Sequence, residues 1–380
     1  MVRLLFSVSV AFALASVPGA QEESYRLKEI SVNRDEFRLA AGVVGQLGRK
    51  AYAAEIDDRT LYFLDLDRDK QLSAAADGLA IEGQPFVVAL PEKLLLSRGQ
   101  YSFRFKGVRE LVLTREELGH DEEIFPMAIA ITEVRIRAGL TPFVVDQVAS
   151  GHARQHLDYL KRNSIVSGRL TMEAHGEDPR RPGYSQGGAY AGRYGILAAG
   201  RSLSEDVMSW FTSAYHGAKL LDARVRRIGL ARRHHLSLIC PVPGAEERAV
   251  ENFQVHPPDG ARAVPANFSS GGEVPSPIPG SSLGAGKGFP LFVLLPTRCQ
   301  MARVTTFELR ASSGTSIRGH LSSPAQPANP LFPRNVGCAF FIPSTRLEDG
   351  ETYTATFQMD GMTEPLVWSF QTWDWELKAR

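Results

Sequence analysis

The chain has 380 residues, which is more than one core usually organises and suits two or three domains. A hydrophobic content of 43% and a charged content of 22% are typical of globular proteins and exclude a chain that is disordered throughout. The formal net charge is only +1, so no basic surplus indicates a nucleic-acid partner.

The N-terminus has the three parts of a secretory signal peptide. Arg3 supplies a positive charge, an apolar run extends from Leu4 to Val17, and small residues up to Ala20 offer a cleavage site. The apolar run is short for a membrane span, although an uncleaved anchor is the alternative. We therefore predict a signal peptide at 1–20. The mature chain is expected to have no transmembrane segment and to be secreted, periplasmic or held at the cell surface.

Residues 21–120 favour β structure. The runs TLYFLDLD, PFVVALP, YSFRFKG and ELVLT are rich in β-branched and aromatic residues and are separated by turn signals. We expect a β-rich N-terminal segment.

Within this segment, Asp65, Asp67 and Asp69 alternate along a loop in the manner of a calcium-binding loop. Such loops usually have glycine at the sixth position and an acid at the twelfth, whereas this chain has Lys70 and Ala76 there. The sequence predicts a calcium site at these three aspartates, with a solvated acidic turn as the alternative.

Residues 121–253 have helical periodicity. One helix is expected to end near Gly139, and a second carries apolar residues at helical spacing from Val145 to Leu160. Ser204 is a candidate N-cap for a further helix that contains Trp210. The segment HHLSLICPVPG then reads as a strand.

Residues 254–380 open with a Pro-, Gly- and Ser-rich stretch and continue as short β runs separated by turns, which is typical of a β-sandwich. In an oxidising compartment, Cys299 and Cys338 are the candidate disulfide pair, and Cys240 is left over. Three unpaired thiols are the alternative.

Two histidines are the first candidates for chemistry. His175 and His216 each stand beside a glycine, and neutral imidazole is a good ligand for zinc. With one carboxylate, such as Glu177, they would make an open zinc site; a polar pocket without metal is the alternative. His152 and His156 lie one helical turn apart and are expected to serve packing.

Serines near these histidines in the sequence are candidate nucleophiles. Ser185 and Ser213 could each pair with a histidine, but no third residue to orient the pair is evident. This reading gives the alternative of a hydrolase.

The segment SEDVMSWFTSAYHGAKLLDARVRRIGL, together with MEAHGEDP before it, resembles the CAP superfamily (SCP/PR-1-like domains) of the bacterial type. That resemblance implies an α-β-α sandwich and a cleft edged by two histidines and two acids. His175 and His216 match the histidines, Glu177 matches one acid, and Trp210 is expected in the core. The family's Gly-Glu-Asn step is replaced by residues 193–199, so one acid is absent.

The C-terminal runs IPSTRLEDGETYTATF and VWSFQT resemble bacterial Ig-like or fibronectin-like domains. The predicted fold class is therefore α+β: a CAP-like α-β-α sandwich with an N-terminal β-rich segment and a C-terminal Ig-like β-sandwich.

The resemblance implies that the cleft binds a small molecule, a lipid or a peptide, and we expect binding rather than catalysis. One alternative is a metal-assisted extracellular hydrolase or protease that uses His175 and His216. Another is a structural cell-surface protein with a vestigial cleft, in contact with surface or matrix components. No cofactor is required by the sequence beyond the possible zinc or calcium.

Overall fold

The computed structural model describes most of the chain and divides it into two compact units, residues 1–121 and 122–380. The described residues are 22–32, 37–40, 43, 45–56, 59–74, 76–82, 84, 86–96, 99–116, 124–166, 170–242, 252–268, 273–274, 276–278, 286–299, 301–329 and 337–373. The predicted signal peptide lies outside them. Among the described residues, no helix is both long and apolar enough to cross a membrane.

The first unit consists of two β-sheets, as the sequence predicts. One sheet has the strand order β1 (Glu22–Arg26), β10 (Glu110–Glu116), β9 (Gly99–Lys106) and β8 (Lys93–Leu96). The other has the order β2 (Lys28–Ser31), β4 (Lys50–Ile56), β5 (Arg59–Leu64), β6 (Gly78–Ile81), β7 (Phe86–Ala89) and β3 (Arg38–Leu39). Phe63 of β5 packs edge-on against Phe103 and Phe105 of β9, with ring centroids 5.9 and 5.2 Å apart, so the two sheets share a core.

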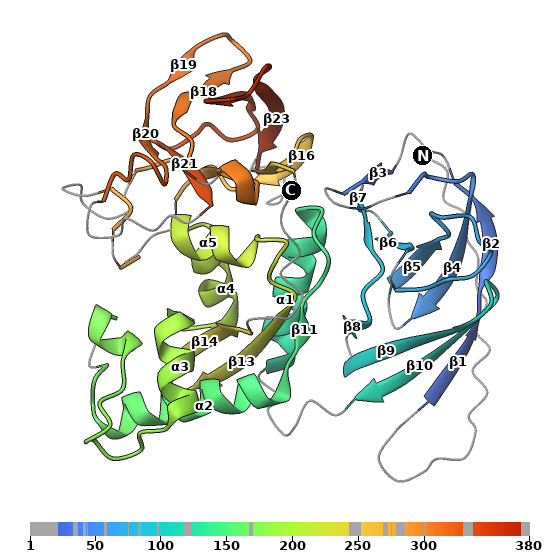
Figure 1. The fold of residues 1–380 in the computed structure, drawn as a ribbon, viewed down its shortest axis with the longest axis horizontal. Helices are drawn as coiled ribbons and strands as arrows, with labels where there is room; N and C mark the ends of the chain where they lie inside the picture. The colour runs from blue at the N-terminus through green and yellow to red at the C-terminus, as the bar shows by residue number, and fades with distance from the viewer. Residues whose placement is uncertain are drawn as a thin grey trace. The chain divides into compact units, whose positions relative to one another are not determined.

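The second unit begins with a sheet between helices (Figure 1). The sheet has the order β11 (Val144–Val145), β13 (Arg227–Arg233), β14 (Leu236–Pro241) and β12 (Ile196–Ala198). The helices are α1 (Ile124–Arg137), α2 (Gln147–Arg162), the short 3₁₀ turn η2 (Met172–His175), α3 (Gln186–Tyr194), α4 (Leu203–Phe211) and α5 (Ala214–Leu220). The cap of α4 is Ser202, which accepts the N–H of Glu205 at 3.2 Å, and not Ser204 as the sequence suggested.

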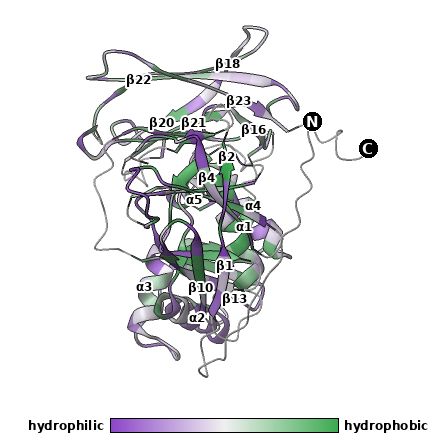
Figure 2. Cartoon of the chain, turned by 90° about the vertical axis from the view of Figure 1, so that its right-hand side faces the viewer, coloured by the Kyte–Doolittle hydropathy of each residue, from purple (hydrophilic) through white to green (hydrophobic). Residues whose placement is uncertain are grey.

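Strand alternation assigns the helices to the two faces of this sheet. Leu236, Leu238 and Cys240 of β14 pack with α2 and α3 in one core cluster. Ser237, which points the other way, donates to Asp206 of α4 at 2.6 Å. Helices α2 and α3 therefore cover one face and α4 covers the other, which is the predicted α-β-α arrangement. Figure 2 shows hydrophobic residues gathered around β13, between these layers.

A glycine permits the closest approach in this packing. A Cβ atom on Gly229 of β13 would lie 2.2 Å from the backbone carbon of Ala149 in α2. Only a residue without a side chain fits there. The hydroxyl of Ser150 then reaches across to accept the N–H of Leu230 at 3.0 Å, so the helix and the strand are joined by a hydrogen bond.

The end of α1 is held by a fully buried arginine. Arg135 donates to the carbonyl oxygens of Thr141 at 2.9 Å, Asp222 at 3.3 Å and Val225 at 3.2 Å, and also to that of Leu220. Its guanidinium lies 3.8 Å from the ring centroid of Phe143. Burial lowers its pKa to about 9. Three of these carbonyls belong to residues 220–225, at the end of α5 and just after it, so Arg135 joins α1 to the approach to β13.

The C-terminal part of the second unit is a two-sheet sandwich. One sheet has the order β15 (Gln254–His256), β17 (Leu291–Leu294), β21 (Cys338–Pro343) and β20 (Gly319–Ser322). The other has the order β16 (Ala261–Val264), β23 (Leu366–Thr372), β22 (Thr352–Met359), β18 (Val304–Ala311) and β19 (Ser316–Ile317). Phe307 contacts Phe341, Phe357 and Trp368 between the sheets. The β-rich C-terminal region is thus confirmed, while its Ig-like or fibronectin-like identity and the boundary at 253/254 stay predictions.

The predicted disulfide is not formed, because all three cysteines are free. Cys299, in the 3₁₀ turn η3 (Thr297–Cys299), packs against the core between the two sheets. Ala339 belongs to that same core, so its neighbour Cys338 points to the opposite face of β21, where Asp222 and Arg224 influence its pKa. The two thiols therefore lie on different sides of one sheet.

Candidate functional site

The two candidate histidines meet at the C-terminal end of α3. His175, the last residue of η2, places its Nδ1 3.0 Å from the carbonyl oxygen of Gly192. His216 lies on α5, three residues before Lys219, whose ammonium group donates to the carbonyl oxygen of Tyr194. Residues three apart on a helix lie on the same side, so His216 and Lys219 face one region. The last turn of α3 thus brings together His175 and Lys219.

The electrostatics of these groups agree with this arrangement. Burial, and then the charges of His156 and Lys219, lower the pKa of His175. Burial, and then the charges of His175 and Lys219, lower the pKa of His216 to about 3. Burial likewise lowers the pKa of Lys219. Both imidazoles are therefore uncharged at neutral pH, and each lies within electrostatic range of the same ammonium group.

An acid that sequence analysis missed lies beneath His216. Glu273 accepts the backbone N–H groups of Ala214 at 3.0 Å, Tyr215 at 2.7 Å and His216 at 3.0 Å, all at the start of α5. One of its carboxylate oxygens also lies 3.6 Å from His216 Nδ1. Burial raises the pKa of Glu273 to about 7, although these hydrogen bonds oppose the rise. Glu273 lies in a Pro- and Gly-rich stretch, where nothing local indicates a buried carboxylate.

The predicted acid Glu177 lies elsewhere. Its carboxylate accepts from His156 Nδ1 at 2.9 Å and from the backbone N–H of Ser185 at 3.0 Å, and the side chains of His156 and Glu177 are both fully buried. The other imidazole nitrogen of His156 lies 2.9 Å from the carbonyl oxygen of Ala174. Glu177 therefore fastens the loop before α3 to α2 and has no hydrogen bond to His175 or His216 among the described residues.

The side chains present do not fit a zinc ion at His175 and His216. Across the described ranges, three side chains of ligand type converge only at Asp65, Asp67 and Asp77. Glu177 is taken up by His156, and Glu273 is taken up by backbone N–H groups. An open zinc site needs three protein ligands, and no third ligand converges on the two histidines among the residues that the structure describes.

Neither candidate serine is arranged as a nucleophile. Ser213 Oγ lies 3.2 Å from His216 Nδ1, but its hydroxyl donates to the carbonyl oxygen of Trp210 at 2.9 Å. Ser185 donates to Gln155 at 2.9 Å and accepts the N–H of Gly188 as the cap of α3. A nucleophilic hydroxyl must donate to its base, and both protons are directed elsewhere.

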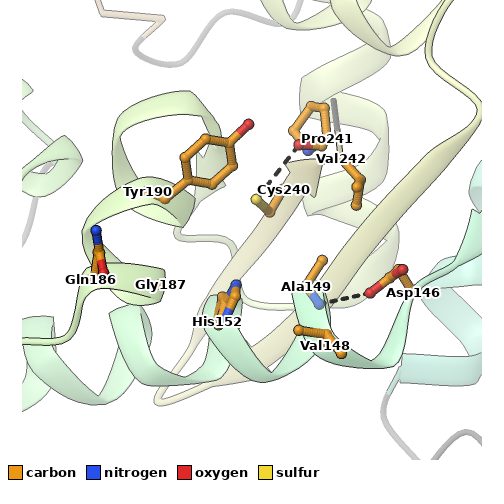
Figure 3. A pocket seen from close by; sticks show the side chains of 10 residues that line it. All are labelled: Asp146, Val148, Ala149, His152, Gln186, Gly187, Tyr190, Cys240, Pro241 and Val242. Carbon is orange, nitrogen blue, oxygen red and sulfur yellow. Dashed lines mark hydrogen bonds between the residues drawn. The ribbon is translucent and has the colours of Figure 1, made fainter. Parts of the chain in front are cut away.

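A pocket of about 540 Å³ opens between α2, α3 and the end of β14. Tyr190 of α3 and Cys240 of β14 project into the space above His152 and Ala149 of α2 (Figure 3). The full lining comprises Asp146, Val148, Ala149, His152, Gln186, Gly187, Tyr190, Cys240, Pro241 and Val242. A Cβ atom on Gly187 would lie 2.2 Å from the ring of His152, so a glycine at this position lets the histidine lie against α3.

Two polar groups of this pocket, Asp146 and Cys240, are engaged or uncharged. Asp146 accepts the N–H of Ala149 at 2.9 Å as the cap of α2 and pairs with Arg227 at 2.7 Å. Burial raises the pKa of Cys240 to about 11, so its thiol is protonated at neutral pH. Among the described residues, the imidazole of His152 and the hydroxyl of Tyr190 make no hydrogen bond, so both are open to a ligand.

The predicted calcium loop in the first unit has a different set of acids. Carboxylate oxygens of Asp65, Asp67 and Asp77 lie within 4.8 Å of one another. Asp69 is not in this group, and its carboxylate accepts the N–H of Gln71 at 2.7 Å. Asp65 accepts the N–H of Lys70 with one oxygen, at 3.1 Å, and its other oxygen is buried without a partner.

Comparison with known proteins agrees with this architecture. The model of the CAP family, described as the cysteine-rich secretory protein family, matches residues 129–235. These residues include both candidate histidines, Glu177 and Trp210, which is fully buried. The resemblance predicted from the sequence is therefore confirmed for this part of the chain.

Two solved structures are similar to the chain. An extracellular protein containing a SCP domain from Bacillus anthracis str. Ames shares 12% identity at a TM-score of 0.26, over 52% of this chain and 68% of that one. A cysteine-rich secretory protein from Staphylococcus aureus subsp. aureus Mu50 shares 10% identity at a TM-score of 0.25, over 62% of this chain and 83% of that one. No curated protein matches the chain.

Proposed function

We propose that the domain in which the CAP model matches residues 129–235 binds a small, uncharged and partly apolar molecule in the pocket between α2, α3 and the end of β14. The pocket itself is the observation that carries this proposal. Its volume of about 540 Å³ falls in the range of ligand sites, and its lining combines aliphatic side chains with a few polar groups.

The lining indicates the chemistry of the ligand. Val148, Pro241 and Val242 offer apolar contact, while His152 and Tyr190 offer hydrogen-bonding groups. The lining has no lysine or arginine, and its one carboxylate, Asp146, is paired with Arg227, so the lining favours a ligand without a formal charge. A short lipid, an apolar peptide side chain or a small neutral molecule meets these requirements.

The site of action is part of the proposal. The N-terminal sequence, with Arg3, an apolar run and small residues before Ala20, supports export from the cytoplasm. We therefore place the ligand among molecules that an exported protein encounters, including those of the cell surface. The hydrolase alternative is not favoured, since Ser185 and Ser213 donate their protons away from the histidines.

The proposal is tested with a neutral dye, N-phenyl-1-naphthylamine, whose fluorescence rises in apolar surroundings. We expect saturable binding to the chain. Val148 is 69% exposed at the pocket, so Val148→Trp can fill the pocket without disturbing a core. This variant should weaken binding by about tenfold or more, which corresponds to at least ~1.4 kcal/mol.

The matched control is Val367→Trp, because Val367 is also exposed, at 60%, and lies on β23 of the C-terminal sandwich. It should bind the dye as the unmodified chain does. Equal affinity of Val148→Trp and the unmodified chain would show that the dye binds elsewhere and would reject the pocket as the site.

The first unit supports a second proposal, a structural calcium ion held by Asp65, Asp67 and Asp77. The buried, unpartnered oxygen of Asp65 favours it, because such an oxygen is costly without a hydrogen bond or a cation. Carboxylate oxygens are the ligands that Ca²⁺ prefers. Burial already raises the pKa of Asp65 and Asp77, and a cation would favour their ionised forms.

A further inference from the structure

The cluster of His175, His216 and Lys219 lies outside the pocket and has a chemistry of its own. His175 and Lys219 are fastened to neighbouring carbonyl groups in the last turn of α3, those of Gly192 and Tyr194. His216 stands one turn before Lys219 on α5. The cluster is open to solvent, because the side chain of His216 is 20% exposed.

Lys219 is a partly buried cation without a counter-ion. Its ammonium group donates to one carbonyl oxygen and, within the described ranges, forms no ion pair. Arg135 shows how this chain otherwise satisfies a buried cation, since its guanidinium is surrounded by four backbone carbonyls. An ammonium group has three donors, so Lys219 keeps two for a ligand.

The acids near the cluster do not compensate this charge. Glu177 is bound by His156 and by the backbone of Ser185. Glu273 is bound by the three N–H groups at the start of α5. The thiol of Cys240 lies within electrostatic range of Lys219, but burial keeps it protonated. Within the part of the chain that the structure describes, no carboxylate pairs with the Lys219 ammonium group, so this cation is open to an anionic ligand.

The imidazoles indicate which anion is suitable. The Gly192 carbonyl can only accept, so Nδ1 of His175 carries a hydrogen and its Nε2 is an acceptor. The same holds for His216, because the Ser213 hydroxyl donates to Trp210 and can only accept from Nδ1. The cluster thus combines two acceptors with one cationic donor.

We propose that His175, His216 and Lys219 form a binding site for phosphate, either free or as a phosphomonoester. The anionic oxygen of phosphate would pair with the Lys219 ammonium group. Free dihydrogen phosphate has two O–H groups, one for each imidazole, whereas a singly protonated phosphomonoester has one O–H, which would donate to one of the two imidazoles. A carboxylate carries no such O–H donor, and sulfate carries none near neutral pH. The site goes beyond the neutral pocket, whose binding it does not require.

The test is a titration of the full chain with inorganic phosphate near pH 6, so that the phosphate carries the O–H groups that the two imidazoles would accept. The chain has 9 histidines, whose side chains can be followed by NMR after selective ¹⁵N labelling. His175→Gln and His216→Gln identify the two signals of the cluster. We expect these two signals to shift saturably, with sulfate binding more weakly than phosphate.

Lys219→Met keeps the length of the side chain and removes the charge, and it should weaken phosphate binding by about tenfold to a hundredfold. Lys219→Arg keeps the charge and should retain binding. Lys161→Met is the control, because Lys161 is exposed in the last turn of α2. Binding of the neutral dye by Lys219→Met should equal that of the unmodified chain, which separates this site from the pocket.

Several results would overturn the proposal. These are the absence of a saturable shift, shifts confined to other histidines, equal binding of sulfate and phosphate, or unchanged phosphate affinity in Lys219→Met. If circular dichroism shows that Lys219→Met does not fold, the phosphate titration of the unmodified chain tests the proposal. The signals of His175 and His216 must then respond to phosphate while those of the other histidines do not.

Discussion

His156 and Glu177 form an ion pair whose side chains are both excluded from solvent, with His156 Nδ1 2.9 Å from Glu177 Oε1. The pair joins the middle of α2 to the loop that leads into α3. That loop also carries His175, two residues before Glu177. The position of His175 against Gly192 therefore depends on the buried contact between His156 and Glu177. Neither His175 nor His216 takes part in that contact.

Glu177→Ala should destabilise the domain that contains α2 and α3 by about 3–5 kcal/mol, because removal of one partner leaves a buried polar group unpaired. Urea unfolding of the domain measures this change. Glu173→Ala is the control: its carboxylate is 63% exposed in a 3.5 Å ion pair with Arg181, so its loss should cost at most ~0.5 kcal/mol. Similar losses in both variants would contradict a structural role for the buried pair.

The elements around the His156–Glu177 pair could be predicted from the sequence, but the contact itself could not. The helices, the strand at 236–241 and the β-rich regions follow from hydrophobic period and turn residues, and the structure confirms them. His175 and His216 were singled out because each stands beside a glycine and because both match the histidines of the CAP resemblance. The partner of Glu177 could not be found, since a buried His–Glu contact across 21 positions has no local signal.

Glu273 and the cysteines show the same limit. Glu273 caps α5 from 57 to 59 positions away, which no local pattern predicts. The pairing of Cys299 with Cys338 assumed that two thiols in one domain lie close together. Strand alternation places the two thiols on opposite faces of a sheet. The sequence alone does not show which residues of β21 face the core, so this separation could not be predicted.

Gly192→Ala should destabilise the contact between α2 and α3 by about 1–3 kcal/mol, as overpacking does. A Cβ atom there would lie 2.2 Å from the ring of His156, which is fixed by its buried bonds. Gly151→Ala is the matched control, because its Cβ atom would meet only Arg154, at 3.8 Å. That variant should gain about 0.5–1 kcal/mol from helix propensity. Thermal unfolding compares the two, and a loss in both would contradict the packing argument.

Arg135→Met should cost more than about 3 kcal/mol, because the substitution leaves buried carbonyl groups without a donor. Arg137→Met is the control on the same helix, since Arg137 is exposed, and it should change stability by at most ~0.5 kcal/mol. Chemical unfolding distinguishes the two. A small effect at Arg135 would mean that water can replace the guanidinium.

The three thiols should differ in reactivity toward iodoacetamide. Cys299 is half-buried and should be modified in the folded chain. Burial raises the pKa of Cys240 to about 11 and that of Cys338 well above its usual value, so both are protonated at pH 8 and lack the reactive thiolate. Peptide mapping before and after unfolding measures this order. Fast modification of Cys240 in the folded chain would show that the pocket admits water to a thiolate.

Calcium should stabilise the first unit, and the geometry makes a sharper prediction than the sequence pattern does. Asp67 belongs to the carboxylate group with Asp65 and Asp77, whereas Asp69 does not. Asp67→Ala should therefore abolish the rise in melting temperature on addition of Ca²⁺, and Asp69→Ala should retain it. Both residues are exposed, so neither change removes a core contact. If Asp69→Ala abolishes the rise and Asp67→Ala retains it, the ligands would include Asp69, as the alternating aspartates of the sequence predict. If added Ca²⁺ changes neither the melting temperature nor the calcium content of the dialysed chain, the ion is excluded. Ligand binding to the folded state must raise stability by mass action.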